Sequence, residues 1–109
     1  VAVASGISGL IATNTTLDRG VVAEPLRALV ESKGAGGLSG APLKPKAREV
    51  RKRILSALRG RLPLMACGGL GSAEDVRGAL DDGAALAQIY SALIFEGPSL
   101  VRRIHQGLE

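Results

Sequence analysis

Three apolar runs organise this chain, and each is followed by a polar or glycine-rich cluster and then by a segment with helical spacing. The runs are residues 8–14 (SGLIATN), 62–69 (LPLMACGG) and 86–95 (LAQIYSALIF). Nearly continuous apolar runs are typical of strands that are buried on both faces of a parallel sheet. Strand, cluster and helix recur three times in this order, which predicts an α/β fold built from βα units with parallel strands.

Three segments carry the spacing and the end signals of helices. The first covers residues 44–60, with its basic residues opposite an apolar face. The second follows Ser72, a typical N-cap residue, and ends at Gly83. The third covers residues 97–108 and has Pro98 near its first position. The apolar faces are Ala47, Val50, Ile54, Ala57 and Leu58 in the first helix, Val76, Ala79 and Leu80 in the second, and Leu100, Val101, Ile104 and Leu108 in the third.

The composition is that of a soluble globular protein, because 46% of the residues are hydrophobic and 22% are charged. Cys67 is the only cysteine, which excludes an intramolecular disulfide and a multi-cysteine metal site and favours a reducing compartment. No apolar stretch approaches the ~20 residues of a membrane span, and no secretory leader begins at Val1. We therefore expect neither a membrane span nor a targeting segment in these residues.

The polar clusters predict a ligand site, because loops at the carboxyl ends of parallel strands converge on one edge of the sheet. The cluster CGGLGS, with Gly68 and Gly69, leads into a capped helix N-terminus and suits a phosphate. Ser91 in YSAL offers an amide and a hydroxyl to the same group. Asn14 in TNTT presents a donor and an acceptor in one plane, which suits a polar ring. Ordinary turns explain each cluster on its own equally well.

These motifs together resemble the C-terminal part of dihydroorotate dehydrogenase, and specifically of its membrane-associated, quinone-using class 2. The family's order and approximate spacing are kept by GLIATNTTLDR, GGLSGAPLK, GRLPLMACGGLGSAEDV and GAALAQIYSALIFEGPSLV. The ending QIYSALIFEGP points to class 2. The resemblance implies that residues 1–109 are the incomplete C-terminal part of an FMN-binding (β/α)₈ barrel domain, contributing strands six to eight.

The resemblance also implies an enzyme of de novo pyrimidine (UMP) biosynthesis that oxidises dihydroorotate to orotate with quinone as acceptor. It would lie peripherally on the cytoplasmic side of the inner membrane. The family's catalytic base, quinone site and membrane-attaching region all precede these motifs, so no catalytic residue is assigned here. The implied substrate contacts are Asn14 and Thr15, and the implied FMN contacts are Thr13, Ser39, Gly40, Gly68, Gly69, Tyr90 and Ser91.

The sequence departs from the family pattern at three places. Ala35 stands where the family usually has Thr, and Cys67 stands where it usually has Val. The connection between TNTT and GGLSG is long, and we expect a loop over residues 18–37, with a short helix in EPLRALVESK, lying over the site. The first two departures leave the implied binding residues in place. The third affects the expected geometry of the loop over residues 18–37.

Several alternatives remain open from the residues alone. The basic helix is most simply the solvated outer face of a barrel helix, and Tyr90 and Phe95, the only aromatic residues, give little support to nucleic-acid stacking. No spacing around His105 suggests a metal site, and no basic residue adjacent in sequence activates Cys67. Another FMN- or phosphate-binding barrel enzyme is a second reading. A third is a fragment without autonomous function, since three βα units leave the inner barrel face and two sheet edges exposed.

Overall fold

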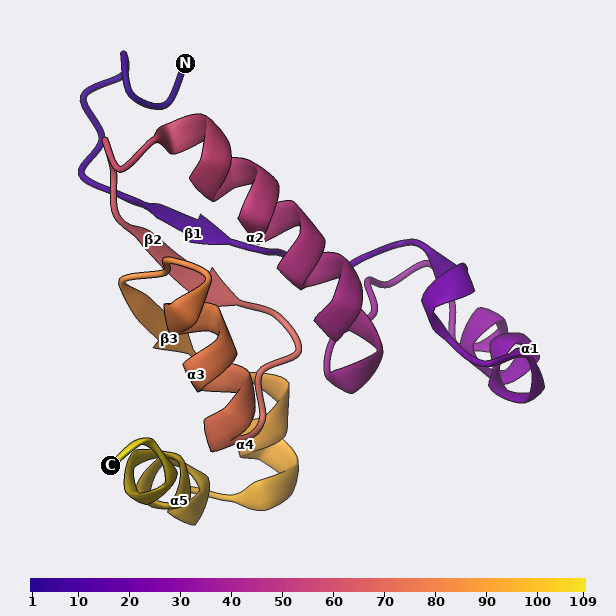
Figure 1. The fold of residues 1–109 in the computed structure, drawn as a ribbon. Helices are drawn as coiled ribbons and strands as arrows, with labels where there is room; N and C mark the ends of the chain where they lie inside the picture. Colours follow the sequence, from indigo (N-terminus) through magenta and orange to yellow (C-terminus); the bar gives the residue numbers. More distant parts are fainter.

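The structure, a computed structural model, describes all 109 residues, which form a three-stranded parallel sheet and the helices that connect and follow its strands (Figure 1). The strands are β1 (Leu10–Ala12), β2 (Leu64–Cys67) and β3 (Leu86–Gln88), in the order β1-β2-β3. Both pairings are parallel, so the two connections β1–β2 and β2–β3 are crossovers. The α/β fold with parallel strands is therefore confirmed.

Helices form in the segments where they are predicted, with two differences. The long connection after β1 contains a short 3-10 helix, η1 (Arg19–Val21), and α1 (Glu24–Ser32), which projects away from the sheet in Figure 1. A second 3-10 helix, η2 (Ala41–Leu43), leads directly into α2 (Lys44–Leu58). The remaining helices are α3 (Ala73–Asp81) after β2, and α4 (Ser91–Glu96) and α5 (Ser99–Leu108) after β3. Of these, α4 is an additional helix that begins within the run predicted as the third strand, and α1 does not lie over the strand ends as expected.

Strand register separates a covered face of the sheet from an uncovered one. Ala12 pairs with Ala66, which pairs with Ala87, and this row of small side chains lies beneath the helices. In the neighbouring row Ile11 pairs with Met65, which pairs with Leu86. Ile11 is 65% exposed and Leu86 is 58% exposed. The expected burial on both faces is therefore wrong for these residues by themselves, and the expected exposure of an inner face and of two edge strands is confirmed.

The core has two parts, both on the helical side of the sheet. The larger consists of Ala12, Leu58, Leu64, Ala66, Leu70, Ala79 and Ala84. The smaller joins Val76 of α3 to Leu100 and Ile104 of α5. Arg48 of α2 forms a bidentate ion pair with Asp82, through Nε–Oδ2 at 2.7 Å and Nη2–Oδ1 at 3.0 Å. This pair joins α2 to the end of α3 and holds the pKa of Asp82 below its usual value.

Two helices differ in detail from the sequence expectation. The run 86–95 forms a strand only to Gln88 and turns into α4 at Ser91. An apolar run of this kind has no periodicity that separates a buried strand from a helix, and α4 leaves Ile94 and Phe95 exposed. In α2, Val50 is exposed whereas Arg51 is buried. None of the helices combines the length and apolar character needed to cross a bilayer.

The packing of α5 predicts that substitutions at two adjacent residues have different effects on the free energy of unfolding. Leu100 is 3% exposed and packs against α3, whereas its neighbour Val101 is 52% exposed. Leu100→Ala in the complete protein is expected to lower the free energy of unfolding by about 2–5 kcal/mol, because it leaves a cavity. Val101→Ala is expected to change it by less than about 0.5 kcal/mol. Denaturant unfolding measures both, and equal effects would contradict the described packing.

Candidate functional site

A cavity of about 860 Å³ lies where β1, β2 and β3 end. This volume is within the range of small-molecule and cofactor sites. Four separate segments contribute to its wall, and they include every site residue expected from the sequence. The wall contains Thr13, Asn14, Thr15, Ser39, Gly40, Gly68, Gly69, Tyr90 and Ser91. The structure thus brings all nine candidates together around one space.

Hydrogen bonds place the polar residues after β1 at the mouth of this cavity. The Thr13 amide donates to the Cys67 carbonyl at 2.6 Å, which ties the end of β1 to the end of β2. The Thr15 amide donates to Asn14 Oδ1 at 2.8 Å. The Thr15 hydroxyl donates to the same oxygen at 3.5 Å, so the Asn14 amide group keeps its two N–H donors for a ligand. The Asn14 side chain is therefore oriented by its own loop while it keeps hydrogen-bonding capacity.

A short antiparallel bridge brings the GGLSG segment beside TNTT. The Thr16 amide donates to the Leu38 carbonyl at 3.0 Å, and the Leu38 amide donates back to Thr16 at 2.7 Å. Thr16 is buried, so this bridge is protected from water. It places Ser39 next to the third strand's loop, where the Ser91 hydroxyl donates to Ser39 Oγ at 2.7 Å. Two loops that are 52 residues apart in sequence therefore share one hydroxyl pair at the cavity.

Gly68 and Gly69 form the part of the wall where backbone approaches most closely. Both have left-handed backbone angles, with φ of 106° and 72°. A Cβ on Gly69 would lie 2.5 Å from the Lys44 Cα, and a Cβ on Gly68 would lie 2.8 Å from the Thr13 hydroxyl oxygen. Only glycine satisfies both the backbone angle and the space. Both glycines also line the cavity, which they reach without side chains of their own.

Two helices begin at the cavity wall. Ser72 caps α3 by accepting a hydrogen bond from the Asp75 amide at 3.1 Å, and Lys44 is the first residue of α2. Free N–H groups at helix N-termini favour anions. The Asp75 carboxylate accepts from the Gly71 amide at 3.0 Å and pairs with the Lys44 ammonium at 2.7 Å. Burial alone would raise the pKa of Asp75, but the hydrogen bonds from Lys44 and Gly71 outweigh it and lower that pKa.

Arg51 of α2 also contacts the turn after β2. The sequence analysis did not identify this residue as part of the site. Its guanidinium Nη1 lies 3.5 Å from the Cys67 carbonyl oxygen and 3.4 Å from that of Gly68. Only 3% of the residue is exposed, and burial lowers its pKa. The expectation that the basic residues of this helix face solvent is therefore wrong for Arg51. The structure also brings Arg51 to the Cys67 backbone, a proximity that no neighbouring sequence position indicated.

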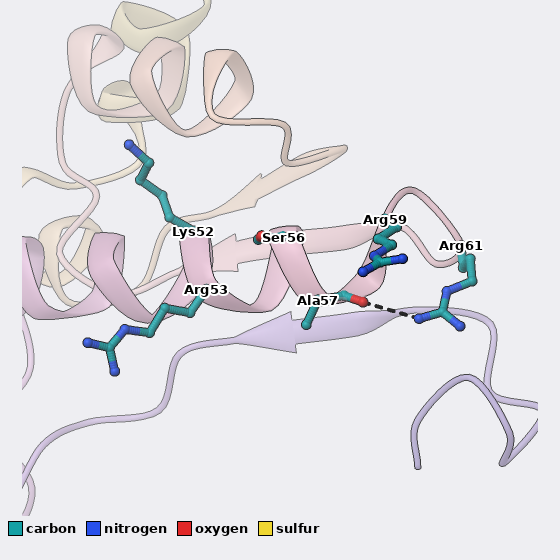
Figure 2. Close-up of a pocket in the computed structure, with 6 residues that line it drawn as sticks. All are labelled: Lys52, Arg53, Ser56, Ala57, Arg59 and Arg61. Carbon is teal, nitrogen blue, oxygen red and sulfur yellow. Dashed lines mark hydrogen bonds between the residues drawn. The ribbon is translucent and has the colours of Figure 1, made fainter.

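A second, shallower cavity of about 650 Å³ lies at the other end of α2 (Figure 2). Its basic side chains include Lys52, Arg53, Arg59 and Arg61. Arg61 donates to the carbonyls of Ala57 at 3.1 Å and Leu58 at 3.0 Å, which caps the helix. Arg53 is paired with Glu49 at 2.6 Å. Arg53 and Arg61 are thus engaged by groups of α2 itself, and none of the nine expected residues lies here.

The larger cavity offers what a phosphorylated ligand with a polar ring requires. Backbone amides, hydroxyls and the N-terminus of α3 suit a phosphate, and the Asn14 amide group suits a ligand that accepts hydrogen bonds. The turn of Gly68 and Gly69 lines the cavity with no side chain of its own, so the residues present fit a flavin mononucleotide. Gly71, Ser72, Lys44 and Asp75 also line this cavity and were not expected as site residues. Of these four residues, Ser72 was identified from the sequence, as a helix N-cap.

Comparisons with known proteins identify the family of these motifs. The sequence model described as dihydroorotate dehydrogenase matches residues 1–109. The dihydroorotate dehydrogenase (quinone) of Kineococcus radiotolerans is 46% identical, over 95% of this chain and 28% of its own length. That of Aeromonas salmonicida is 48% identical, over 92% of this chain and 29% of its own length.

A solved structure gives the same result for the fold. The DHODH from Eimeria tenella, crystallised in complex with ferulenol, has a TM-score of 0.84 and 35% sequence identity. The match covers 98% of this chain and 27% of that chain. The fold is therefore that of part of a dihydroorotate dehydrogenase. The chain spans less than a third of the length of these relatives.

Two glycine substitutions test the geometry of the turn. Gly69→Ala is expected to lower the free energy of unfolding of the complete protein by about 2–4 kcal/mol, because the methyl group meets the Lys44 backbone at a left-handed φ. Gly78→Ala lies inside α3 with no heavy atom of another element within 4 Å and is expected to stabilise by up to about 1 kcal/mol. Denaturant unfolding compares them, and a neutral Gly69→Ala would contradict the close approach.

Proposed function

Because the chain belongs to the dihydroorotate dehydrogenase family, we propose that the complete protein oxidises dihydroorotate to orotate with FMN as cofactor and a quinone as final acceptor. Two electrons and two protons leave the substrate, and two electrons and two protons convert the quinone to a quinol. Bound FMN supplies the two-electron acceptor for this oxidation. The observation that carries the proposal is the convergence of all nine expected residues on one cavity at the strand ends.

The phosphate end of the cofactor is assigned to the turn after β2 and the loop after β3. Gly68 and Gly69 present backbone without side chains, and Ser91 adds its backbone amide at the start of α4, since its hydroxyl donates to Ser39. In (β/α)₈ barrels the loops after strands seven and eight frequently bind phosphate in this way. Ser39, hydrogen-bonded to Ser91, and Gly40 would lie along the rest of the flavin.

The substrate end is assigned to the loop after β1. Asn14 and Thr15 would hold the pyrimidine ring, and Thr13, fixed to the Cys67 carbonyl, would lie near the flavin. Because Asn14 Oδ1 already accepts from the Thr15 amide, the Asn14 amide group is available to donate to the substrate. These residues bind and orient, while the proton-abstracting base is expected outside residues 1–109. The 109 residues alone are accordingly expected to be inactive.

The quinone and the membrane are assigned to parts of the protein outside this chain. The curated relatives are named for the use of a quinone. We propose that the complete protein is a peripheral protein of the cytoplasmic side of the inner membrane and participates in pyrimidine (UMP) biosynthesis. Dihydroorotate-dependent reduction of a quinone by the purified complete protein tests this activity, and its absence in flavin-loaded protein would contradict it.

Asn14→Ala in the complete protein tests the substrate assignment. It is expected to lower kcat/KM for dihydroorotate by about 10- to 100-fold, because it removes a ligand hydrogen bond and leaves a polar ligand group unpaired. Ser56→Ala, on the far end of α2 and outside this cavity, is the control and should leave kinetics unchanged. Steady-state kinetics distinguishes the two. Turnover of Asn14→Ala within about twofold of the unmodified protein would remove Asn14 from the substrate site.

A further inference from the structure

Lys44 is held at the cavity wall by an ion pair with Asp75, which also accepts a hydrogen bond from a backbone amide. Its ammonium lies 2.7 Å from Asp75 Oδ1, and the other carboxylate oxygen of Asp75 accepts from the Gly71 amide at 3.0 Å. The Asp75 side chain is only 13% exposed, whereas that of Lys44 is 46% exposed. The pair therefore has a buried anionic side and a cationic side that is open to the cavity.

Lys44 is the only source of positive side-chain charge in the wall of this cavity. No other lysine and no arginine is found among the residues that line this cavity. The two carboxylates of the wall are Asp75 and Glu96, and Glu96 is paired with Arg103 at 2.7 Å, away from the lining. Without Lys44, the wall would present an uncompensated carboxylate beside the glycine turn. Such a charge repels a phosphate monoester, which carries about −1.5 to −2 at neutral pH.

The Lys44 backbone packs closely against the glycine turn. Its Cα is the atom that a Cβ on Gly69 would meet at 2.5 Å, so the first turn of α2 rests directly on the turn assigned to the phosphate. An ammonium group has three N–H donors. The Asp75 bond accounts for one of them, and a half-exposed side chain leaves the others free for a ligand.

We propose that Lys44 binds the phosphate of FMN directly, bridging it to Asp75, an inference that rests on the proposed function above. The backbone amides of the glycine turn and of Ser91 recognise the phosphate by shape, and Lys44 supplies the positive charge. Asp75 is a positioning residue, because it holds the Lys44 ammonium and the Gly71 amide in register. The proposal separates the recognition of FMN from that of riboflavin, which has the same ring and ribityl chain without the phosphate.

The test compares FMN with riboflavin in the complete protein after removal of its flavin. Dissociation constants are measured by quenching of flavin fluorescence at fixed ionic strength. The variants are Lys44→Gln, Lys44→Arg and, as matched control, Lys46→Gln. Lys46 lies on the same first turn of α2, pairs with Asp18 at 2.7 Å and does not line the cavity. Its loss removes the same charge from the same helix.

Lys44→Gln is expected to weaken FMN binding by about 10- to 100-fold and to leave riboflavin binding within about twofold. Lys44→Arg should fall between it and the unmodified protein, and Lys46→Gln should bind FMN normally. Unchanged FMN affinity in Lys44→Gln overturns the inference, as does an equal loss of FMN and riboflavin or an equal loss in Lys46→Gln. If the unmodified protein binds neither flavin, the proposed function itself is wrong, and this inference falls with it.

Discussion

The packing of the first residue of α2 against the turn after β2 is the contact on which the site depends. Gly69 has no side chain, and the Lys44 backbone occupies the space that one would fill. This approach sets the N-terminus of α2 beside that of α3, where Lys44 pairs with Asp75, and both glycines line the cavity. Arg51, about two helical turns further along α2, lies close to the carbonyl oxygens of Cys67 and Gly68. A helix and a strand end are thereby locked together around a glycine pair.

Much of the site was accessible from the sequence because its residues occur as local motifs at strand ends. Parallel strands bring their carboxyl ends to one edge, so TNTT, CGGLGS and YSAL had to meet once the strands were recognised, whereas GGLSG is brought there by the bridge between Thr16 and Leu38. Lys44 and Arg51 were not accessible in this way. Both lie in a run of basic residues whose composition is typical of a solvated face. Only the tertiary packing of α2 distinguishes Arg51, which is buried, from neighbours such as Lys52, which is exposed.

The same reasoning explains where the fold differed from expectation. The run 86–95 is apolar throughout, and its division at Tyr90 into β3 and α4 depends on contacts that a local pattern does not encode. The uncovered row of Ile11, Met65 and Leu86 has the apolar character of a barrel interior, which is packed in layers of side chains from several strands. Three strands present this row without enclosing it. The strand sequences therefore reflect a larger barrel than these residues form.

The most direct measurement is a crystal structure of the complete protein with FMN bound. The account predicts that the phosphate lies between the Gly68–Gly69 turn and the Tyr90–Ser91 loop, with Asn14 facing the space beside the flavin ring. The competing location is the basic surface at the other end of α2, around Lys52, Arg59 and Arg61 (Figure 2). A phosphate found there, or anywhere away from the glycine turn, would contradict the assignment of this cavity as the cofactor site.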